Sequence, residues 1–233
     1  SNGAGEMLSG GRRLRDGSGE IHHHLGVSAF AQYAVVDQSS AIKVDKDVPF
    51  DVAALFGCAM STGYGAVTRT AGVSAGETVA IIGLGGVGLS AVIAAHAVGA
   101  SRVLAVDPVQ SKRDLALELG ATEAVHPDDL MATIESIWEH RPQWVFEAVG
   151  SGPVLEQAFA ITGRGGTTVS TGLPHPCVEL RIPALTIIAE SRTIKGSYMG
   201  STRPQVDIPA MVELWRAGRL PVEKLISSRR KLT

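Results

Sequence analysis

The segment GLGGVG, residues 83–88, has the residue types and spacing of a turn that binds nucleotide phosphates. In such a turn Gly83 permits a sharp bend, Gly85 removes the side chain that would block a pyrophosphate, and Gly88 lets the next helix pack closely on the preceding strand. The start of that helix offers unpaired N–H groups and a positive dipole end to the phosphates. The other turn residues that we expect at this dinucleotide site are Leu84 and Gly86.

Asp107 is the acidic partner of this turn, because it follows Gly88 by about 20 residues. At that distance a carboxylate accepts hydrogen bonds from the hydroxyls of the adenosine ribose, and its charge would repel a 2′-phosphate. The sequence therefore predicts NAD rather than NADP. Lys112 is placed either to reach the same ribose or to be a solvated helix residue, and both interpretations stay open. We expect Arg113 at the surface.

A strand must precede this turn and a helix must follow it. Residues 78–82, TVAII, are typical of a buried parallel strand, and residues 87–99 form a small-residue segment that we interpret as a helix. The stretch 79–100 contains no charged residue and is also long enough to cross a bilayer. Each of its glycines would cost a membrane helix about 1 kcal/mol relative to alanine, and no aromatic belt or basic flank brackets it. We therefore predict a strand–turn–helix and no membrane partner.

Strands and helices alternate through most of the remaining chain. This alternation predicts an α/β fold with a doubly wound parallel sheet. Ligands of such sheets lie beyond the carboxyl ends of the strands, which here include residues 148–150 and 171–173. The expected strands are 102–106, 123–125, 143–150, 165–172 and one within 185–198; the expected helices are 111–120, 128–139, 153–162 and 205–220.

Composition narrows the classes of protein. The chain has 233 residues, of which 45% are hydrophobic and 19% are charged, as in a globular protein with a sizeable core. Its net charge of −2 gives no reason to expect nucleic acid as a partner. Cys58 and Cys177 are far apart and form no CxxC pair, so we expect free thiols and a cytoplasmic location.

Residues 57–91, GCAMSTGYGAVTRTAGVSAGETVAIIGLGGVGLSA, strongly resemble the zinc-dependent medium-chain alcohol dehydrogenases. The resemblance extends over nearly the whole chain. It is closer to the branch with the glutathione-dependent formaldehyde dehydrogenases and liver-type enzymes than to the quinone reductases. It implies a Rossmann domain joined to the remnant of a β-rich, GroES-like catalytic domain. Further matching segments are 20–37, 118–125, 146–151 and 194–201.

The resemblance also implies roles for particular residues. Cys58 matches the third protein ligand of the catalytic zinc, Thr62 matches a residue beside the nicotinamide, and Val87 would lie behind the nicotinamide ring. In this family zinc acts as a Lewis acid that lowers the pKa of the alcohol, and the alkoxide passes a hydride to NAD⁺. The remaining matched cofactor residues are Thr171, Gly172 and Leu173 on the far side of the ring and Ser197, Tyr198 and Met199 at its carboxamide.

The chain departs from the family at the metal site. Family members begin with a long segment that carries two more zinc ligands, a hydroxyl for a proton relay and a structural zinc lobe. That segment has no counterpart here, and the chain also ends before the family's final segment, so we expect a piece of a longer protein. A catalytic zinc needs three protein ligands and an open position, and Cys58 is one matched ligand. The run His22–His24 does not supply the others, because three adjacent histidines cannot face one tetrahedral ion without a strained loop.

The chain is expected to divide near residue 58. Strands at 31–36 and 41–44 and a helix at 49–57 would belong to the catalytic-domain remnant. A strand region near Ile187 and Ile188 would lie close to the sheet edge, and in the family two such edges pair in a homodimer. The three expected parts are 1–57, the remnant; 58–200, the NAD-binding Rossmann domain; and 201–233, a terminal helix with a return to the catalytic domain.

Three functions fit these residues. The leading hypothesis is an NAD-dependent, zinc-type alcohol dehydrogenase that acts on a small alcohol or aldehyde, inactive as this fragment. An alternative is a dinucleotide-binding module without chemistry of its own. The third is a zinc-free reductase of the same superfamily, against which Cys58 and Asp107 argue: such relatives need no zinc ligand and usually take NADPH. No residue identifies the alcohol.

Overall fold

The computed structural model describes residues 2–138 and 140–230. The chain forms two compact units, Ser1–Asp45 and Lys46–Thr233, and each is described by itself. The boundary expected near residue 58 lies inside a continuous helical segment, Phe50–Ala71, of the second unit. The division into three parts stays a prediction.

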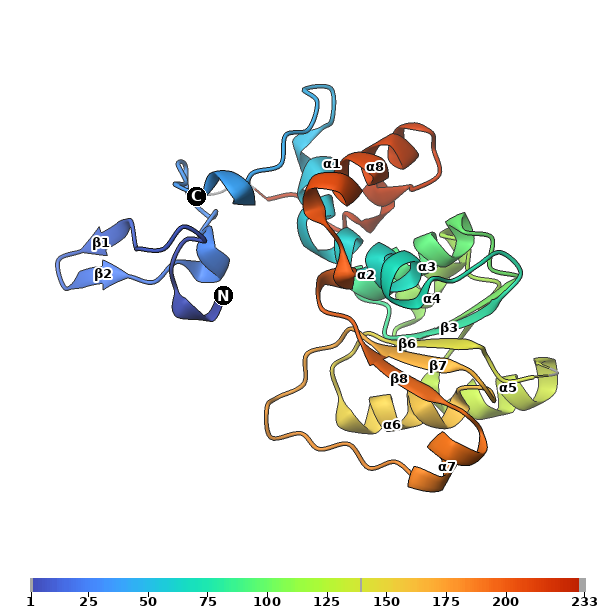
Figure 1. The fold of residues 1–233 in the computed structure, drawn as a ribbon. Helices are drawn as coiled ribbons and strands as arrows, with labels where there is room; N and C mark the ends of the chain where they lie inside the picture. Colours follow the sequence, from blue (N-terminus) through green and yellow to red (C-terminus); the bar gives the residue numbers. More distant parts are fainter. Residues whose placement is uncertain (1, 139, 231–233) are drawn as a thin grey trace. The chain divides into compact units, whose positions relative to one another are not determined.

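A six-stranded parallel sheet forms the centre of the second unit (Figure 1). Its strand order is β5-β4-β3-β6-β7-β8, so the chain reverses direction across the sheet between β3 and β6. This confirms the prediction of a doubly wound α/β fold. The strands are β3 (Thr78–Ile82), β4 (Arg102–Val106), β5 (Glu123–Val125), β6 (Trp144–Glu147), β7 (Thr167–Ser170) and β8 (Thr193–Gly196).

Helices cover both faces of this sheet: α2, α3 and α4 lie on one side, and α5 and α6 on the other (Figure 1). The helices are α1 (Phe50–Leu55), α2 (Ser61–Gly65), α3 (Gly86–Ala97), α4 (Gln110–Glu118), α5 (Leu130–Ile137), α6 (Gly152–Ile161), α7 (Ala184–Ala189) and α8 (Pro204–Arg216). Two π-helical turns, Phe56–Met60 and Ala66–Ala71, flank α2. Short 3₁₀ turns occupy Asn2–Ala4, His24–Gly26, Gln38–Ser40, Pro127–Asp129, Met199–Ser201 and Val222–Leu225.

The core follows from the alternation of side chains along buried strands. Ala80 and Ile82 of β3 pack with Leu130 of α5 and Ile161 of α6 in one cluster. The intervening residue of β3, Ile81, is fully buried as well and faces α3. Burial on both faces explains why the strand is a continuous apolar run. Other members of the cluster are Leu104, Val106, Ile134, Trp138, Val145 and Ala158.

Residues 79–100 form β3, the glycine turn and the 12-residue α3, which confirms the strand–turn–helix prediction. A different segment, Phe50–Ala71, is long and apolar enough to cross a membrane by length and composition, with 22 residues and a hydropathy of 1.2. Half of its apolar window is buried inside the structure. The core helix of a globular protein passes the same test, so this is weak evidence for a membrane span.

Helix α8 is held to the helical segment Phe50–Ala71 by an ion pair whose carboxylate is buried. Arg69 donates to the Asp207 carboxylate, which also accepts the backbone N–H of Arg203 at 2.6 Å. Burial alone would raise the pKa of Asp207, but these bonds outweigh it and hold the pKa below its usual value. The carboxylate therefore stays charged at neutral pH.

Two expectations for local structure are wrong. Residues 31–36 and 41–44 are not strands; a 3₁₀ turn at Gln38–Ser40 lies between them. A strand needs a hydrogen-bonded neighbour, and no described segment pairs with these residues. The strand within 185–198 exists, as β8, and ends the sheet. However, Ile187 and Ile188 lie in α7 rather than in that strand.

Other differences are small. The helix expected at 128–139 begins as a 3₁₀ turn and continues as α5, and its expected last residue lies outside the described residues. The first unit contains a hairpin that was not predicted, β1 (Leu14–Asp16) with β2 (Gly19–Ile21). All six residues of this hairpin are exposed, so it lacks the alternating apolar signal that identifies a strand.

Candidate cofactor site at the carboxyl ends of the strands

The turn between β3 and α3 requires glycine at its first position for two reasons. Gly83 has φ +94°, in the left-handed region that favours glycine. A Cβ on Gly83 would also lie 2.6 Å from Cγ2 of Val149 and 3.2 Å from the backbone of Ala148. The turn that follows β3 is therefore packed against the loop that follows β6.

Gly85 and Gly88 differ in how much space the structure leaves for a side chain at each position. A Cβ on Gly88 would lie 1.8 Å from the carbonyl oxygen of Gly83, which no relaxation of a side chain could relieve. A Cβ on Gly85 would meet no described atom within 4 Å. Gly85 has an extended conformation, with φ −77° and ψ −170°, that any residue can adopt. The fold therefore needs glycine at position 88, whereas at position 85 it leaves open space.

That open space lies at the N-terminus of α3. Gly85 precedes the helix, and no described side chain caps the first turn. The first N–H groups of a helix have no partner within the helix, and they carry the positive end of its dipole. These properties make the site suitable for phosphate oxygens.

Asp107 stabilises the fold itself, in addition to its expected role in binding the ribose. Its buried carboxylate accepts the backbone N–H of Leu84 at 2.8 Å and that of Val109 at 2.9 Å. It thereby ties the glycine turn to the end of β4. A carboxylate has about four lone-pair positions, so acceptor capacity remains for a ribose.

Two basic residues lie beside Asp107. The Lys112 Nζ is 3.5 Å from Oδ2 of Asp107, so it lies close to the carboxylate that is expected to bind the ribose. Arg113, expected at the surface, is half-buried and donates to the Asp107 carbonyl oxygen at 2.6 Å. The corner therefore combines one buried negative charge with two positive groups.

Glu147 is a buried carboxylate that the sequence analysis missed. One of its oxygens accepts the backbone N–H groups of Val149 and Gly150 at 2.8 and 2.6 Å, and the other accepts the Ser170 hydroxyl at 2.8 Å. Its own carbonyl oxygen accepts the N–H of Thr171 at 2.8 Å. Glu147 thus holds together the loops that follow β6 and β7. An acidic residue at the end of an apolar strand, directly before a glycine-containing loop, was the signal available in the sequence.

Those two loops lie in contact, as expected for neighbouring strand ends. A Cβ on Gly172 would lie 2.1 Å from the backbone nitrogen of Gly150. Leu173 follows and is 78% exposed. An apolar side chain this exposed at the end of a parallel strand is free to contact a ligand.

The structure brings the residues expected at the nicotinamide end to the same edge. The Thr62 hydroxyl donates to the Cys58 carbonyl at 2.8 Å and lies 3.8 Å from the Met199 sulfur. A Cβ on Gly63 would lie 2.3 Å from the carbonyl oxygen of Val87, so α2 packs directly on the glycine turn. The segment containing Met199 is anchored by Ser197, which is buried, and Tyr198 is exposed. The contact of these residues with a cofactor stays a prediction.

Zinc does not fit the residues that this chain supplies. Cys58 is an exposed free thiol on a π-helical turn. Within residues 2–138 and 140–230, no group of three or more His, Cys, Asp or Glu side chains is arranged to hold a metal ion. The run at His22–His24 forms no such group: the buried His23 accepts the backbone N–H of Arg13 at 3.0 Å. The described residues therefore do not form a catalytic zinc site by themselves.

Comparisons with known proteins agree on the family and the fold. The family model of zinc-binding dehydrogenases matches residues 86–216. Alcohol dehydrogenase B of Mycobacterium tuberculosis H37Rv is 38% identical, and the match covers 98% of this chain and 63% of that protein.

Solved structures show the same pattern. An alcohol dehydrogenase zinc-binding domain protein from Burkholderia ambifaria is 36% identical with a TM-score of 0.89, covering 96% of this chain and 61% of that one. A protein from Sinorhizobium meliloti 1021, assigned to the zinc-binding dehydrogenases and solved with bound NADP, is 26% identical with a TM-score of 0.77, covering 90% and 60%. The chain thus spans about three fifths of the length of the proteins that it matches.

The contrast between Gly85 and Gly88 gives a direct test of the phosphate turn. Gly85→Val should fold normally, within about 0.5 kcal/mol of the parent, because its side chain enters open space. It should bind NADH at least about tenfold more weakly, because the side chain blocks the pyrophosphate. Gly88→Ala should instead lose about 3 kcal/mol of stability or more. Circular dichroism, chemical denaturation and NADH titration measure these effects.

The control is Gly57→Ala, another exposed glycine whose Cβ would enter open space. It should leave NADH affinity unchanged. Parent affinity for NADH in a folded Gly85→Val variant would show that the turn does not hold the cofactor.

Proposed function

The chain belongs to the zinc-binding dehydrogenase family, and from this premise we propose that it is the dinucleotide-binding part of an NAD-dependent, zinc-type alcohol dehydrogenase. The observation that carries the proposal is the open space at Gly85, in front of the uncapped N-terminus of α3 and beside Asp107. Similarity to proteins named as alcohol dehydrogenases supports the substrate class, a small alcohol or aldehyde.

The proposed cofactor lies across the carboxyl ends of the strands. The N–H groups at the start of α3 bind the pyrophosphate, and the Asp107 carboxylate accepts the ribose hydroxyls. Thr62 and Val87 lie at the nicotinamide end, with the exposed Leu173 on the far side of the ring. When bound, NAD⁺ accepts a hydride from the alcohol. The residues of this chain bind and orient the ring and exclude water from one side of it.

The charge at Asp107 favours NAD over NADP, because a 2′-phosphate would approach a buried carboxylate. Lys112, 3.5 Å away, offsets part of this charge. The S. meliloti protein was solved with NADP, but it shares 26% of its sequence with this chain. The carboxylate is therefore the stronger argument, and NAD is the proposed cofactor.

Calorimetry with both cofactors tests this assignment. The parent chain should bind NADH at least about tenfold more tightly than NADPH. Asp107→Asn should narrow that difference, and Lys112→Gln should widen it, because it removes a positive charge from the same corner. Circular dichroism must show that Asp107→Asn is folded, since Asp107 also holds the glycine turn. Equal affinity of the parent for the two cofactors would contradict the assignment.

We also propose that this chain alone does not oxidise an alcohol. One thiolate, Cys58, does not hold zinc at catalytic geometry, and an alcohol without a Lewis acid keeps its proton at neutral pH. This favours the second hypothesis, a binding module, for the chain in isolation. A zinc-free reductase remains the third, and Cys58 and Asp107 argue against it.

Residues 1–233 with zinc, NAD⁺ and a panel of primary and aryl alcohols should therefore bind the cofactor without turnover. Zinc uptake, measured by metal analysis after gel filtration, should be weak and non-stoichiometric. The matched control is Cys58→Ser, which removes the thiolate and should show equally little NADH formation. Steady NADH formation that disappears in Cys58→Ala would mean that the chain builds a working metal site, with His22–His24 the first residues to substitute.

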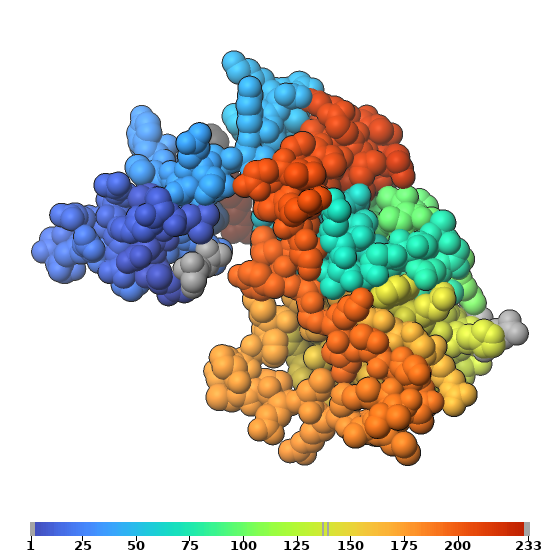
Figure 2. Space-filling view, viewed as in Figure 1, coloured from blue at the N-terminus to red at the C-terminus, as the bar shows by residue number. Residues whose placement is uncertain are grey.

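We also propose that the protein is a cytoplasmic homodimer. Both cysteines are free and exposed, as suits a reducing compartment. β8 is the last strand of its sheet and offers unpaired backbone groups to another copy. The segment between β7 and β8 lies at the surface of the unit (Figure 2). It presents Leu185 and Ile188, which are 73% and 78% exposed.

Sedimentation at micromolar concentration tests this association. The parent should be a dimer, and Ile188→Glu should shift it toward monomer by placing a charge in the apolar contact. Leu117→Glu, a similar change at an exposed residue of α4, should have no effect. A parent chain that sediments as a clean monomer would contradict the proposal.

A further inference from the structure

A cavity of about 950 Å³ lies at the opposite edge of the sheet from the proposed cofactor site. Thr78 and Arg102, which line it, are the first residues of β3 and β4, and Arg192 directly precedes β8. A second cavity, of about 480 Å³, shares Arg141, Glu190 and Arg192 with the first. None of the residues expected to hold the dinucleotide lines either cavity. These cavities are therefore separate from the site already described.

The lining of the larger cavity is strongly basic. It contains Arg102, Arg141, Arg164 and Arg192, and the one carboxylate among its described lining residues is Glu190. Arg102 is paired with Glu123 at 2.6 Å and lies over the Trp138 ring. The whole chain carries a net charge of −2. Like charges repel one another, so this concentration of arginines around one open cavity needs a reason.

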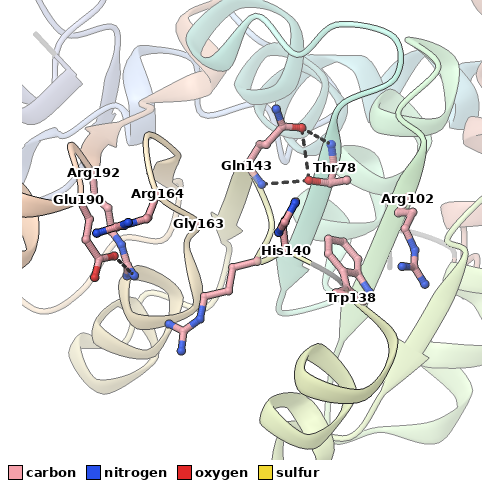
Figure 3. Close-up of a pocket in the computed structure, with 10 residues that line it drawn as sticks. Thr78, Arg102, Trp138, His140, Gln143, Gly163, Arg164, Glu190 and Arg192 are labelled. Carbon is pink, nitrogen blue, oxygen red and sulfur yellow. Dashed lines mark hydrogen bonds and ion pairs between the residues drawn. The ribbon is translucent and has the colours of Figure 1, made fainter.

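The closest grouping is at one end of the cavity. Figure 3 shows Arg164 and Arg192 together at that end, with Glu190 beside them, and Arg102 at the other end. Gln143 and Thr78 lie between the two ends and are hydrogen-bonded to each other. The amide oxygen of Gln143 is used in this contact, which leaves its NH₂ group as a further donor.

Arg192 is buried, with 6% of its side chain exposed, and its donors are incompletely used. One terminal nitrogen donates to the carbonyl oxygens of Phe159 and Ala160 at 2.6 and 3.1 Å, and the other donates to Glu190 at 2.5 Å. The Nε atom is buried and has no hydrogen-bond partner in the described part of the chain. A buried donor without a partner costs about 1–3 kcal/mol, so a partner is expected there.

A purely structural role explains part of this arrangement. Arg192 and Arg141 both donate to carbonyl oxygens in the last turn of α6, where cations are favourable. This role does not use the Nε atom of Arg192. It also does not involve Arg164, which is exposed and makes no hydrogen bond to any described residue. Accessible donors of Arg141 and Arg164, from two separate loops, therefore remain around one cavity, and Arg192 adds its positive charge to the lining.

We propose that this cavity binds a small molecule with two or three linked phosphate groups, held by Arg141, Arg164 and Arg192. Guanidinium groups are planar forks that match phosphate oxygens, and charge-assisted bonds of this kind are the strong ones. A volume of about 950 Å³ exceeds what one orthophosphate fills and lies at the upper end of the range for small-molecule sites.

The probe is sodium tripolyphosphate, titrated by calorimetry at constant ionic strength into the full chain. Because tripolyphosphate could also bind the glycine turn, the titration is made in the parent and in Gly85→Val. Binding with one molecule per chain should persist in Gly85→Val. It should weaken at least about tenfold in Arg164→Ala and in Arg141→Ala. Arg15→Ala, an exposed arginine on β1 with the same charge change, should leave it within about twofold.

Three results would overturn the proposal. Loss of binding in Gly85→Val would place the anion at the cofactor turn. Parent affinity in the Arg141→Ala, Arg164→Ala double variant would show that these arginines do not hold the anion. Equal weakening by Arg15→Ala would indicate non-specific charge attraction. A parallel titration of Gly85→Val with a nucleoside triphosphate distinguishes two kinds of ligand. Tighter binding than that of tripolyphosphate indicates a nucleotide, and equal binding indicates a free oligophosphate.

Discussion

The approach of α3 to the end of β3 is the contact on which the site depends. The hydrogen atom of Gly88 faces the Gly83 carbonyl, at a distance where no side-chain carbon fits. This contact lets the helix begin directly at the end of a central strand and directs its N-terminus over the carboxyl edge of the sheet. The buried carboxylate of Asp107 then holds the turn in place through the Leu84 N–H. The proposed phosphate site is therefore built mainly from backbone, and its position follows from the packing of one glycine.

The central strands could be predicted because they are buried on both faces. Residues 78–82 and 102–106 are short, mainly apolar runs between turn signals, and the structure has them as strands with those bounds. The half-buried edge strand 123–125 was also predicted with its observed bounds. Residues 31–36 and 41–44 have similar composition but are not strands. Composition measures whether a segment suits a sheet, whereas pairing depends on a neighbour that may lie anywhere in the chain. No pattern within these segments contains that information.

The glycine turn of the candidate site could be predicted, because backbone geometry determines it. Buried charged residues that interact with other segments were missed. Gly83 and Gly88 have roles that follow from the spacing of the turn. Arg192 is a buried charge whose carbonyl partners come from α6, so its environment is invisible to a local pattern. Glu147 binds the loop that directly follows it and also Ser170 of the next strand, and only the second contact is invisible to a local pattern. The carboxylate of Glu147 is satisfied by three bonds, whereas the Nε of Arg192 lacks a partner. This difference separates a buried charge that completes the fold from one that has donor capacity left over.

The two edges of one parallel sheet differ in their electrostatics, and this explains why different groups serve each edge. Helices of a doubly wound sheet present their N-termini at the carboxyl edge, where backbone N–H groups and the dipole favour an anion without any basic side chain. At the amino edge the helices end, and their last carbonyl oxygens are partly negative. Arg141 and Arg192 first neutralise the end of α6 there. An anion at that edge must therefore be held by guanidinium groups that the helix end does not already use, and the exposed Arg164 is such a group.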